Sequence, residues 1–261
     1  MQEIYEKIEE ADMILIGLGE EFDDVNFLKN IAHYQEGKDW LKENQMLWLL
    51  PAYDEYFREH KSDHNQQIKL ALEKLAELIK EKNYFVVTTA FNEAIEKVSF
   101  KEGRVVRPCG GSKKTQCSCG GSLRELTEQQ KNTVKNYIEV LISGEKPMEE
   151  LELGICPKCN KPYSFNNIYA ADYDEQGYLT QWQIYTKWLQ GSLNKKLLIL
   201  ELGEGMRFPT VIRFPFEKIA YFNQKAEFYR INEKLYQMSE ELKEKGISIS
   251  KNSIDWLQGM C

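Results

Sequence analysis

The sequence predicts an α/β protein, with a Rossmann-like parallel sheet covered by helices on both faces and a small zinc-binding insert domain. Two observations support this fold class. Short apolar runs that end in glycine or threonine alternate with segments of helical periodicity, as in doubly wound sheets. One internal stretch is instead rich in Gly, Lys and Ser at its start and is bracketed by two pairs of cysteines, which is typical of a small metal-stapled module.

The elements before the cysteine pairs follow in order. Residues 1–11 form a charged amphipathic helix pattern, and 12–17 is a short apolar run that predicts a buried strand. Residues 26–81 keep apolar side chains at helical spacing, which predicts a helical module. The runs at 84–89 and 104–107 predict the second and third strands.

The remaining elements complete an alternating pattern. Residues 127–142 predict a helix between the cysteine pairs, and 182–189 predict another one after them. The most strand-like run of the chain is 196–202, and 228–232 predicts a further strand. The charged segment 233–245 is expected to be a helix.

These patterns predict two domains. We assign residues 1–108 and 163–261 to a Rossmann-like large domain that includes the helical module at about 26–81, and residues 109–162 to a small zinc-binding domain. Ligands of doubly wound sheets bind at the carboxyl ends of the strands, where the strand order reverses. The glycine turns that follow the first strand and the run at 196–202 are therefore expected at a binding site.

The composition is that of a folded protein with mixed charges. Of 261 residues, 42% are hydrophobic and 12% aromatic, so the chain can bury a core. The formal net charge of −7 argues against nucleic acid or an anionic membrane as the main partner, since both need a basic face. No apolar run has membrane-spanning length, and the charged N-terminus does not resemble a secretory signal. We therefore expect a soluble, cytoplasmic protein.

Four of the six cysteines form two close pairs, Cys117-Ser-Cys119 and Cys156-Pro-Lys-Cys159. In a reducing compartment such pairs favour a metal over disulfides. Four thiolates suit tetrahedral zinc, which would be structural because no coordination position stays open. The alternatives are partly buried free thiols or a site that has lost its metal, and the tight spacing of the first pair leaves the set of ligands open.

A Gly-x-Gly turn follows the first predicted strand, at Gly17 and Gly19. Two such glycines let the backbone turn sharply and approach the phosphates of a dinucleotide. The third glycine of that fingerprint is absent, so an ordinary turn between a strand and a helix is the alternative.

Several motifs then share one order and spacing along nearly the whole chain. They are ADMILIGLG at 11–19, YFVVTT at 84–89, PCGGSKKTQCSCGG at 108–121, CPKCNKP at 156–162, LLILELGEGMRFPTVIRFPFE at 197–217 and AEFYRIN at 226–232. In these motifs the chain resembles the sirtuin family of NAD-dependent protein deacylases, and more particularly its bacterial branch.

The resemblance implies a large Rossmann-like domain and a small zinc domain, with NAD and an acyl-lysine peptide meeting in the cleft between them. The four paired cysteines match the zinc ligands of the family. Five further residues match positions that contact NAD, and would equally contact ADP-ribose: Gly17, Gly19, Thr88, Gly203 and Asn232.

The departures from the family pattern fall on its chemistry. Glu20 and Glu21 follow the glycine turn, where their carboxylates would occupy the pyrophosphate site or repel the pyrophosphate. One like-charge contact at about 4 Å costs on the order of a few kcal/mol near a surface. Ala90 stands where the family has the asparagine of its Asn-x-Asp motif, and Asn92 replaces the aspartate. Cys109 stands at the position of the general-base histidine, and a thiol is a poor substitute for imidazole because of its higher pKa.

Cys109 admits three interpretations. It is a reactive thiol near Lys113 and Lys114, a neutral residue left after the loss of catalysis, or an alternative zinc ligand. The three histidines of the chain all lie in the predicted helical module. His60 and His64 share a helix face, which predicts either a solvated polar face or a metal site.

Three functions are compatible with these observations. The first is a sirtuin-like protein that binds NAD or ADP-ribose but has lost deacylase chemistry, and acts as a sensor or as a partner of another protein. The second is an active NAD-dependent deacylase or ADP-ribosyltransferase that uses other residues. The third is a zinc-stapled scaffold that binds only protein.

Overall fold

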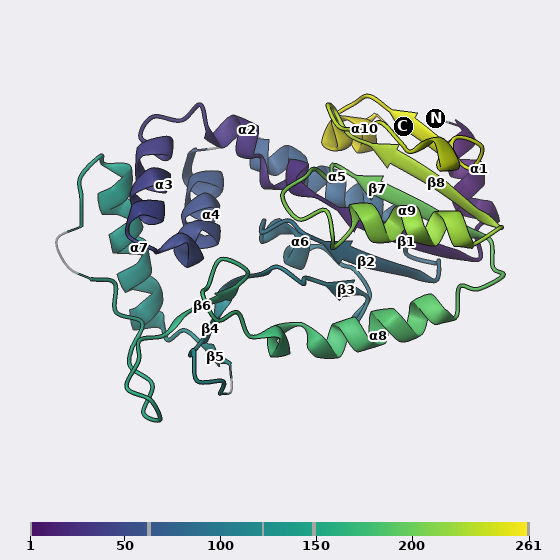
Figure 1. The fold of residues 1–261 in the computed structure, drawn as a ribbon. Coiled ribbons are helices and arrows are strands. Elements are labelled where there is room, and N and C mark those ends of the chain that lie inside the picture. Colours follow the sequence, from purple (N-terminus) through teal and green to yellow (C-terminus); the bar gives the residue numbers. More distant parts are fainter. Residues whose placement is uncertain (1, 62–63, 122, 148–149, 260–261) are drawn as a thin grey trace. The chain divides into compact units, whose positions relative to one another are not determined.

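The computed structural model describes residues 2–61, 64–121, 123–147 and 150–259 (Figure 1). The chain divides into two compact units. Unit 1 comprises residues 1–23, 64–108 and 180–261, and unit 2 comprises residues 24–63 and 109–179.

Unit 1 is built on a six-stranded parallel sheet. Its strands, in chain order, are β1 (Met13–Leu18), β2 (Tyr84–Thr88), β3 (Val105–Val106), β7 (Leu197–Leu202), β8 (Ala226–Ile231) and β9 (Gly246–Ile249). Their order across the sheet is β3-β2-β1-β7-β8-β9, which is the doubly wound order of Rossmann sheets. The order reverses between β1 and β7, so the switch point lies at the carboxyl ends of these two strands.

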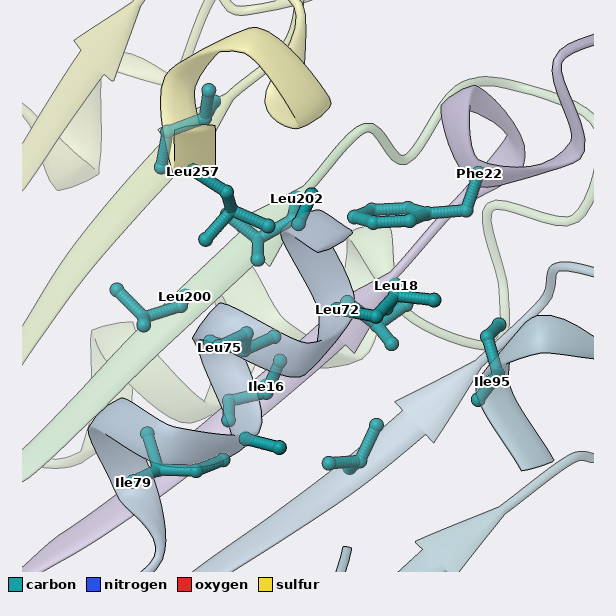
Figure 2. Close-up of a cluster of buried hydrophobic side chains, with 14 of the residues drawn as sticks. Ile16, Leu18, Phe22, Leu72, Leu75, Ile79, Ile95, Leu200, Leu202 and Leu257 are labelled. Carbon is teal, nitrogen blue, oxygen red and sulfur yellow. The ribbon is translucent and has the colours of Figure 1, made fainter. Parts of the chain in front are cut away.

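Helices cover both faces of this sheet. Their bounds are α1 (Gln2–Glu10), α5 (His64–Ile79), α6 (Ala94–Lys97), α8 (Leu179–Gln190), α9 (Arg213–Phe222) and α10 (Ser253–Gln258). On one face, Ile16 and Leu18 of β1 pack with Leu72 and Leu75 of α5 (Figure 2). The opposite face packs against α9, since a Cβ at Gly17 would lie 2.6 Å from the side chain of Ile212, just before that helix. Strands buried on both faces explain the continuous apolar runs of the sequence.

Unit 2 combines short helices with a three-stranded antiparallel sheet of order β5-β4-β6. Its elements are α2 (Val25–Leu28), α3 (Tyr34–Glu43), the 3-10 helix η2 (Leu47–Leu49), α4 (Leu50–Lys61), β4 (Gly110–Gln116), β5 (Arg124–Glu125), α7 (Glu128–Ile142) and β6 (Ser164–Asn167). Tyr34, Tyr53 and Phe57 form an aromatic cluster that shares one core with Ile138 and Phe165. Within the described residues, no helix of either unit has the length and apolar character needed to cross a membrane.

The structure groups the helical segment differently from the sequence. The sequence assigns a helical module at about 26–81 to the large domain; residues 24–63 belong to unit 2, and residues 64–81 belong to unit 1. The physical reason is the aromatic cluster, which α3 and α4 bury together with α7 and β6. The division into large and small domains at the predicted boundaries stays a prediction.

The predicted helix at 233–245 is wrong. This segment is irregular apart from a short 3-10 helix, η4 (Glu240–Leu242), and it leads directly into β9. Its residues favour helix locally, but two buried arginines hold the backbone in another form. Arg213 donates to the carbonyl oxygens of Leu235 and Gln237 at 2.9 and 3.4 Å, and Arg230 donates to that of Gln237 at 2.7 Å. Tertiary hydrogen bonds thus override local propensity.

Candidate functional site

The five predicted cofactor residues lie together in unit 1. They sit at or just after the carboxyl ends of four adjacent strands, in the order β2, β1, β7 and β8: Thr88, Gly17 with Gly19, Gly203 and Asn232. Parallel strands bring such positions to one edge of the sheet, where doubly wound proteins bind ligands.

The glycines at this edge allow the backbone loops to approach each other closely. The Gly19 amide donates to the carbonyl oxygen of Leu202 at 2.8 Å, and a Cβ at Gly19 would collide with the backbone of Glu204. Gly203 has φ = +66°, in the left-handed region that favours glycine. The space that the Gly-x-Gly turn provides is therefore used by the loop that follows β7.

Glu20 extends over this loop. Its carboxylate oxygen Oε1 accepts a hydrogen bond from the backbone amide of Met206 at 3.2 Å. The same oxygen lies directly against Gly205, where any side chain would overlap it. Glu20 therefore takes up one of the exposed backbone donors at the strand ends.

Glu21 takes up two more donors. Its Oε1 accepts from the amide of Glu233 at 2.8 Å, and its Oε2 accepts from the amide of Ser253 at 2.8 Å. Burial raises the pKa of this carboxyl, although the two amide bonds oppose the rise by favouring the charged form. The amides of Met206, Glu233 and Ser253 thus all donate to side-chain carboxylates.

Glu204 is a site residue that sequence reasoning missed. Its side chain is buried, and it accepts a hydrogen bond of 2.6 Å from the Thr89 hydroxyl. Burial raises the pKa of Glu204 to about 8, with further contributions from the charges of Glu201 and Glu20. At neutral pH this carboxyl is mostly protonated. The available signal was an acidic residue between the two glycines that follow β7.

Sequence reasoning also missed Asp23 and Arg207, which contact the loop that follows β2. The buried Asp23 carboxylate accepts from the amides of Phe91 and Asn92 at 2.6 and 2.9 Å, and it forms an ion pair with Arg207. The Arg207 guanidinium lies 5.2 Å from the ring centroids of Phe91 and Phe208. Phe91 and Asn92 lie where the sirtuin pattern has its Asn-x-Asp motif. The contacts with Asp23 and Arg207 hold this loop in place.

The polar side chains expected at the cofactor also have internal partners. Asn232 donates to the carbonyl oxygen of Glu204 at 3.0 Å and accepts from the amides of Lys234 and Leu235 at 2.9 and 2.7 Å. Thr88 donates to the carbonyl oxygen of Leu18 at 2.9 Å and accepts from the amide of Ala90 at 3.1 Å. Both side chains hold the loops in place.

The four paired cysteines converge in unit 2. The sulfur atoms of Cys117, Cys119, Cys156 and Cys159 all lie within 4.8 Å of one another. The Cys117–Cys159 and Cys119–Cys156 sulfur distances are 3.2 and 3.8 Å. Tetrahedral zinc with Zn–S bonds of about 2.3 Å places its sulfurs about 3.8 Å apart, so the four thiols fit that ion. The first pair follows β4, and the second lies in a turn before β6.

Cys109 is separate from this cluster. Cys109 directly precedes β4 in unit 2, where its side chain is buried and its carbonyl oxygen accepts from the amide of Ile168 at 3.0 Å. Its sulfur is not one of the four clustered sulfurs, and Lys114 on β4 is exposed. Cys261 lies outside the described residues.

Comparison with known sequences gives one informative relative. No protein-family model matches the chain. A curated protein of Staphylococcus aureus (strain Mu50 / ATCC 700699), named Protein ADP-ribosyltransferase, is 24% identical over 182 residues. The match covers 68% of this chain but 56% of that protein, so the chain spans little more than half the length of this relative.

Comparison with solved structures gives a consistent fold. Sir2Tm bound to a propionylated peptide matches with a TM-score of 0.56 and 13% identity, over 99% of this chain and 95% of that one. A structure on sirtuin substrate affinity matches with a TM-score of 0.57 and 13% identity, over 99% and 96%. A Sir2 complex with a p53 peptide and NAD+ matches with a TM-score of 0.55 and 12% identity, over 99% and 95%. With its doubly wound sheet and its four clustered cysteines, the chain has the sirtuin fold.

Proposed function

We propose that this protein binds ADP-ribose or NAD at the carboxyl ends of β1, β2, β7 and β8, and that it does not deacylate lysine. One observation carries the proposal: the amides of Met206, Glu233 and Ser253 already bind anionic groups, the carboxylates of Glu20 and Glu21. The amides of Glu233 and Ser253 converge on the single carboxylate of Glu21. Converging backbone amides form an anion site, and a phosphate of a nucleotide can take the same hydrogen bonds.

A nucleotide that binds at this edge would compete with the side chains of Glu20 and Glu21 for the same backbone amides. A pyrophosphate can reach the three amides only after Glu20 and Glu21 rotate away, because two anions cannot share one donor set. The two carboxylates thus act as an internal competitor. We therefore expect the affinity for the nucleotide to be lower than it would be if these two carboxylates were absent.

The loss of deacylation is proposed from the residues at the two expected catalytic positions. Ala90 has no polar side chain that could orient a ribose, and Asn92 is buried with its side-chain amide donating to the carbonyl oxygen of Phe22 at 2.8 Å. Cys109 would have to serve as the base in place of an imidazole, and thiols as a class are mostly protonated at neutral pH, so they are poor acceptors of a proton.

Two other candidate functions have specific support. The name of the S. aureus relative favours ADP-ribosyl transfer, in which the same nucleotide site would serve an enzyme. The complete internal pairing of the three amides favours a scaffold that binds no nucleotide.

Titration calorimetry with ADP-ribose and NAD tests these alternatives on the full-length protein. We expect Glu20→Ala combined with Glu21→Ser to bind ADP-ribose at least about tenfold more tightly, since two like-charge contacts are removed. Glu6→Ala combined with Glu81→Ser makes the same change in charge at exposed positions of unit 1 and should leave the affinity unchanged.

The outcomes separate the three functions. If neither the protein nor the Glu20/Glu21 variant binds ADP-ribose at millimolar concentration, the scaffold is correct and the proposal fails. Release of nicotinamide from NAD, detected by mass spectrometry, would instead identify an enzyme.

We also propose that the four clustered cysteines hold one structural zinc ion. When bound, zinc would cross-link the turn after β4 to the turn before β6. Backbone amides, first that of Lys158, lower the pKa of Cys156 to about 6, whereas the hydrogen bond with Cys117 raises the pKa of Cys119 to about 12. Without an ion, these thiols compete for protons within one cluster.

A further inference from the structure

A cavity in unit 2 is lined by none of the strand-end residues of unit 1 and by none of the four cysteines, although Ile155 and Asn160 next to the second cysteine pair belong to its wall. It has a volume of about 580 Å³, within the range of ligand sites of roughly 300–1,000 Å³. Every residue of its wall belongs to residues 40–48 or 137–164, so the cavity is a feature of unit 2 alone. It therefore does not depend on the nucleotide site.

Aromatic rings form one side of this cavity. Trp40 of α3, Trp48 of η2 and Tyr137 of α7 all line it and are only half-buried. The Trp40 and Tyr137 rings are inclined at 62° with their centroids 6.0 Å apart, so they form two adjoining walls. The ring of Trp48 packs against the buried ring of Phe165, with their centroids 5.8 Å apart. Inclined aromatic walls of this kind bind cations through the negative faces of their rings.

The wall of the cavity also carries negative charge. Glu150 and Glu152 line it with exposed carboxylates, and no lysine, arginine or histidine occurs among its described lining residues. Within the described part of the chain, neither carboxylate forms an ion pair. The pKa of Tyr137 is raised to about 12, first by burial and then by the charge of Glu150, so this charge acts on the aromatic wall.

We propose that this cavity binds a lysine side chain of a basic partner peptide. The ammonium group contacts the faces of Trp40 and Tyr137 and pairs with Glu150 and Glu152. Both kinds of contact are absent for a neutral or an acidic ligand. The negative formal charge of the whole chain, −7, adds attraction for a basic peptide at long range.

The size of the cavity and its rim favour a peptide over a free amine. One ammonium group on a short chain fills only part of 580 Å³. Ile155, also in the wall, leaves 62% of its surface exposed, and a residue next to the lysine can cover it. Tyr163 is not counted among the binding rings, because Arg124 already lies 4.7 Å from its centroid.

Calorimetry on the full-length protein tests the proposal. The probe is a short glycine–serine peptide with a central Lys-Leu pair, and its neutral match carries norleucine in place of lysine. We expect the lysine peptide to bind at least about tenfold more tightly, because norleucine keeps the shape and loses the cation.

Two variants assign the binding to this cavity. Glu150→Gln combined with Glu152→Gln should weaken binding of the lysine peptide about 5- to 30-fold, as should Trp40→Leu. Glu43→Gln combined with Glu145→Gln removes the same charge from exposed positions outside the cavity and should leave the affinity within about twofold. Thermal melting checks that each variant is folded; because both cavity glutamates are exposed, their variant decides the test if Trp40→Leu does not fold.

Four results would overturn the proposal. They are equal binding of the lysine and norleucine peptides, unchanged binding by the Glu150/Glu152 variant, no binding at millimolar peptide, and binding of free butylamine as tightly as the peptide. Failure of ADP-ribose to bind does not bear on this site.

Discussion

Glu20 and Glu21 place two carboxylates on three backbone amides, one of which follows β7, one β8 and one β9. A carboxylate and a phosphate oxygen accept the same kind of hydrogen bond, so these side chains imitate a bound anion. The sequence predicts the conflict, because both glutamates directly follow the glycine turn. It does not predict which amides they reach, since those lie more than 180 residues further along the chain at Met206, Glu233 and Ser253.

Glu204 gives a prediction for the pH dependence of stability. Its pKa is about 8 in the folded protein and about 4.5 when solvated, so between these values the folded state binds more protons than the unfolded chain. The contribution of Glu204 to the free energy of unfolding is therefore full below pH about 4.5 and is lost as the pH rises to 8, by on the order of 3–5 kcal/mol.

Urea unfolding of the protein and of Glu204→Gln at several pH values checks this expectation. The variant should lose less stability than the unmodified protein between pH 5 and 8, because its amide cannot ionise. Parallel curves for the two proteins would contradict the role assigned to Glu204. Glu6→Gln, at an exposed position, is the matched control.

At the scale of elements, the periodicity of the sequence predicts those strands and helices whose structure depends mainly on local sequence. β1, β2 and β7 are apolar runs buried on both faces, and α7 begins with a capping box in which Thr127 and Gln130 bond each other's backbone. Local pattern fails at 233–245, where hydrogen bonds from Arg213 and Arg230 decide the structure. β9 was missed for the same reason, because its partner β8 supplies the pairing for a half-exposed edge strand.

The buried ion pair on β7 and β8 supports a prediction about these elements. Arg230 donates to both carboxylate oxygens of Glu201 at 2.6 and 2.9 Å, and it also holds Gln237. We expect Arg230→Met to destabilise the protein by about 3–5 kcal/mol, because it leaves the buried Glu201 carboxylate without its closest partner. Adding Glu201→Leu should restore part of the loss. Chemical denaturation measures both, and a double variant less stable than Arg230→Met would contradict the explanation.

At the scale of the whole molecule, the two units have separate cores, and only unit 2 contains the clustered cysteines. We expect chelation of zinc to lower the unfolding temperature of unit 2 while that of unit 1 changes little, since the ion cross-links turns of unit 2 alone. Differential scanning calorimetry with and without a chelator measures this. Cys156→Ser should lose the zinc found by elemental analysis, whereas Cys109→Ser should keep it. Loss of zinc in both variants would make Cys109 a ligand.

The interleaving of the two units along the chain has a consequence for biosynthesis. β1 (Met13–Leu18) pairs with β7 (Leu197–Leu202), so the centre of the parallel sheet cannot close until most of the chain has left the ribosome. Residues 24–63 and 109–179, which form unit 2, emerge completely before β7 does. The nascent chain can therefore fold its cysteine-bearing unit first, while the apolar strand β1 still lacks its partner β7 and is exposed to chaperones.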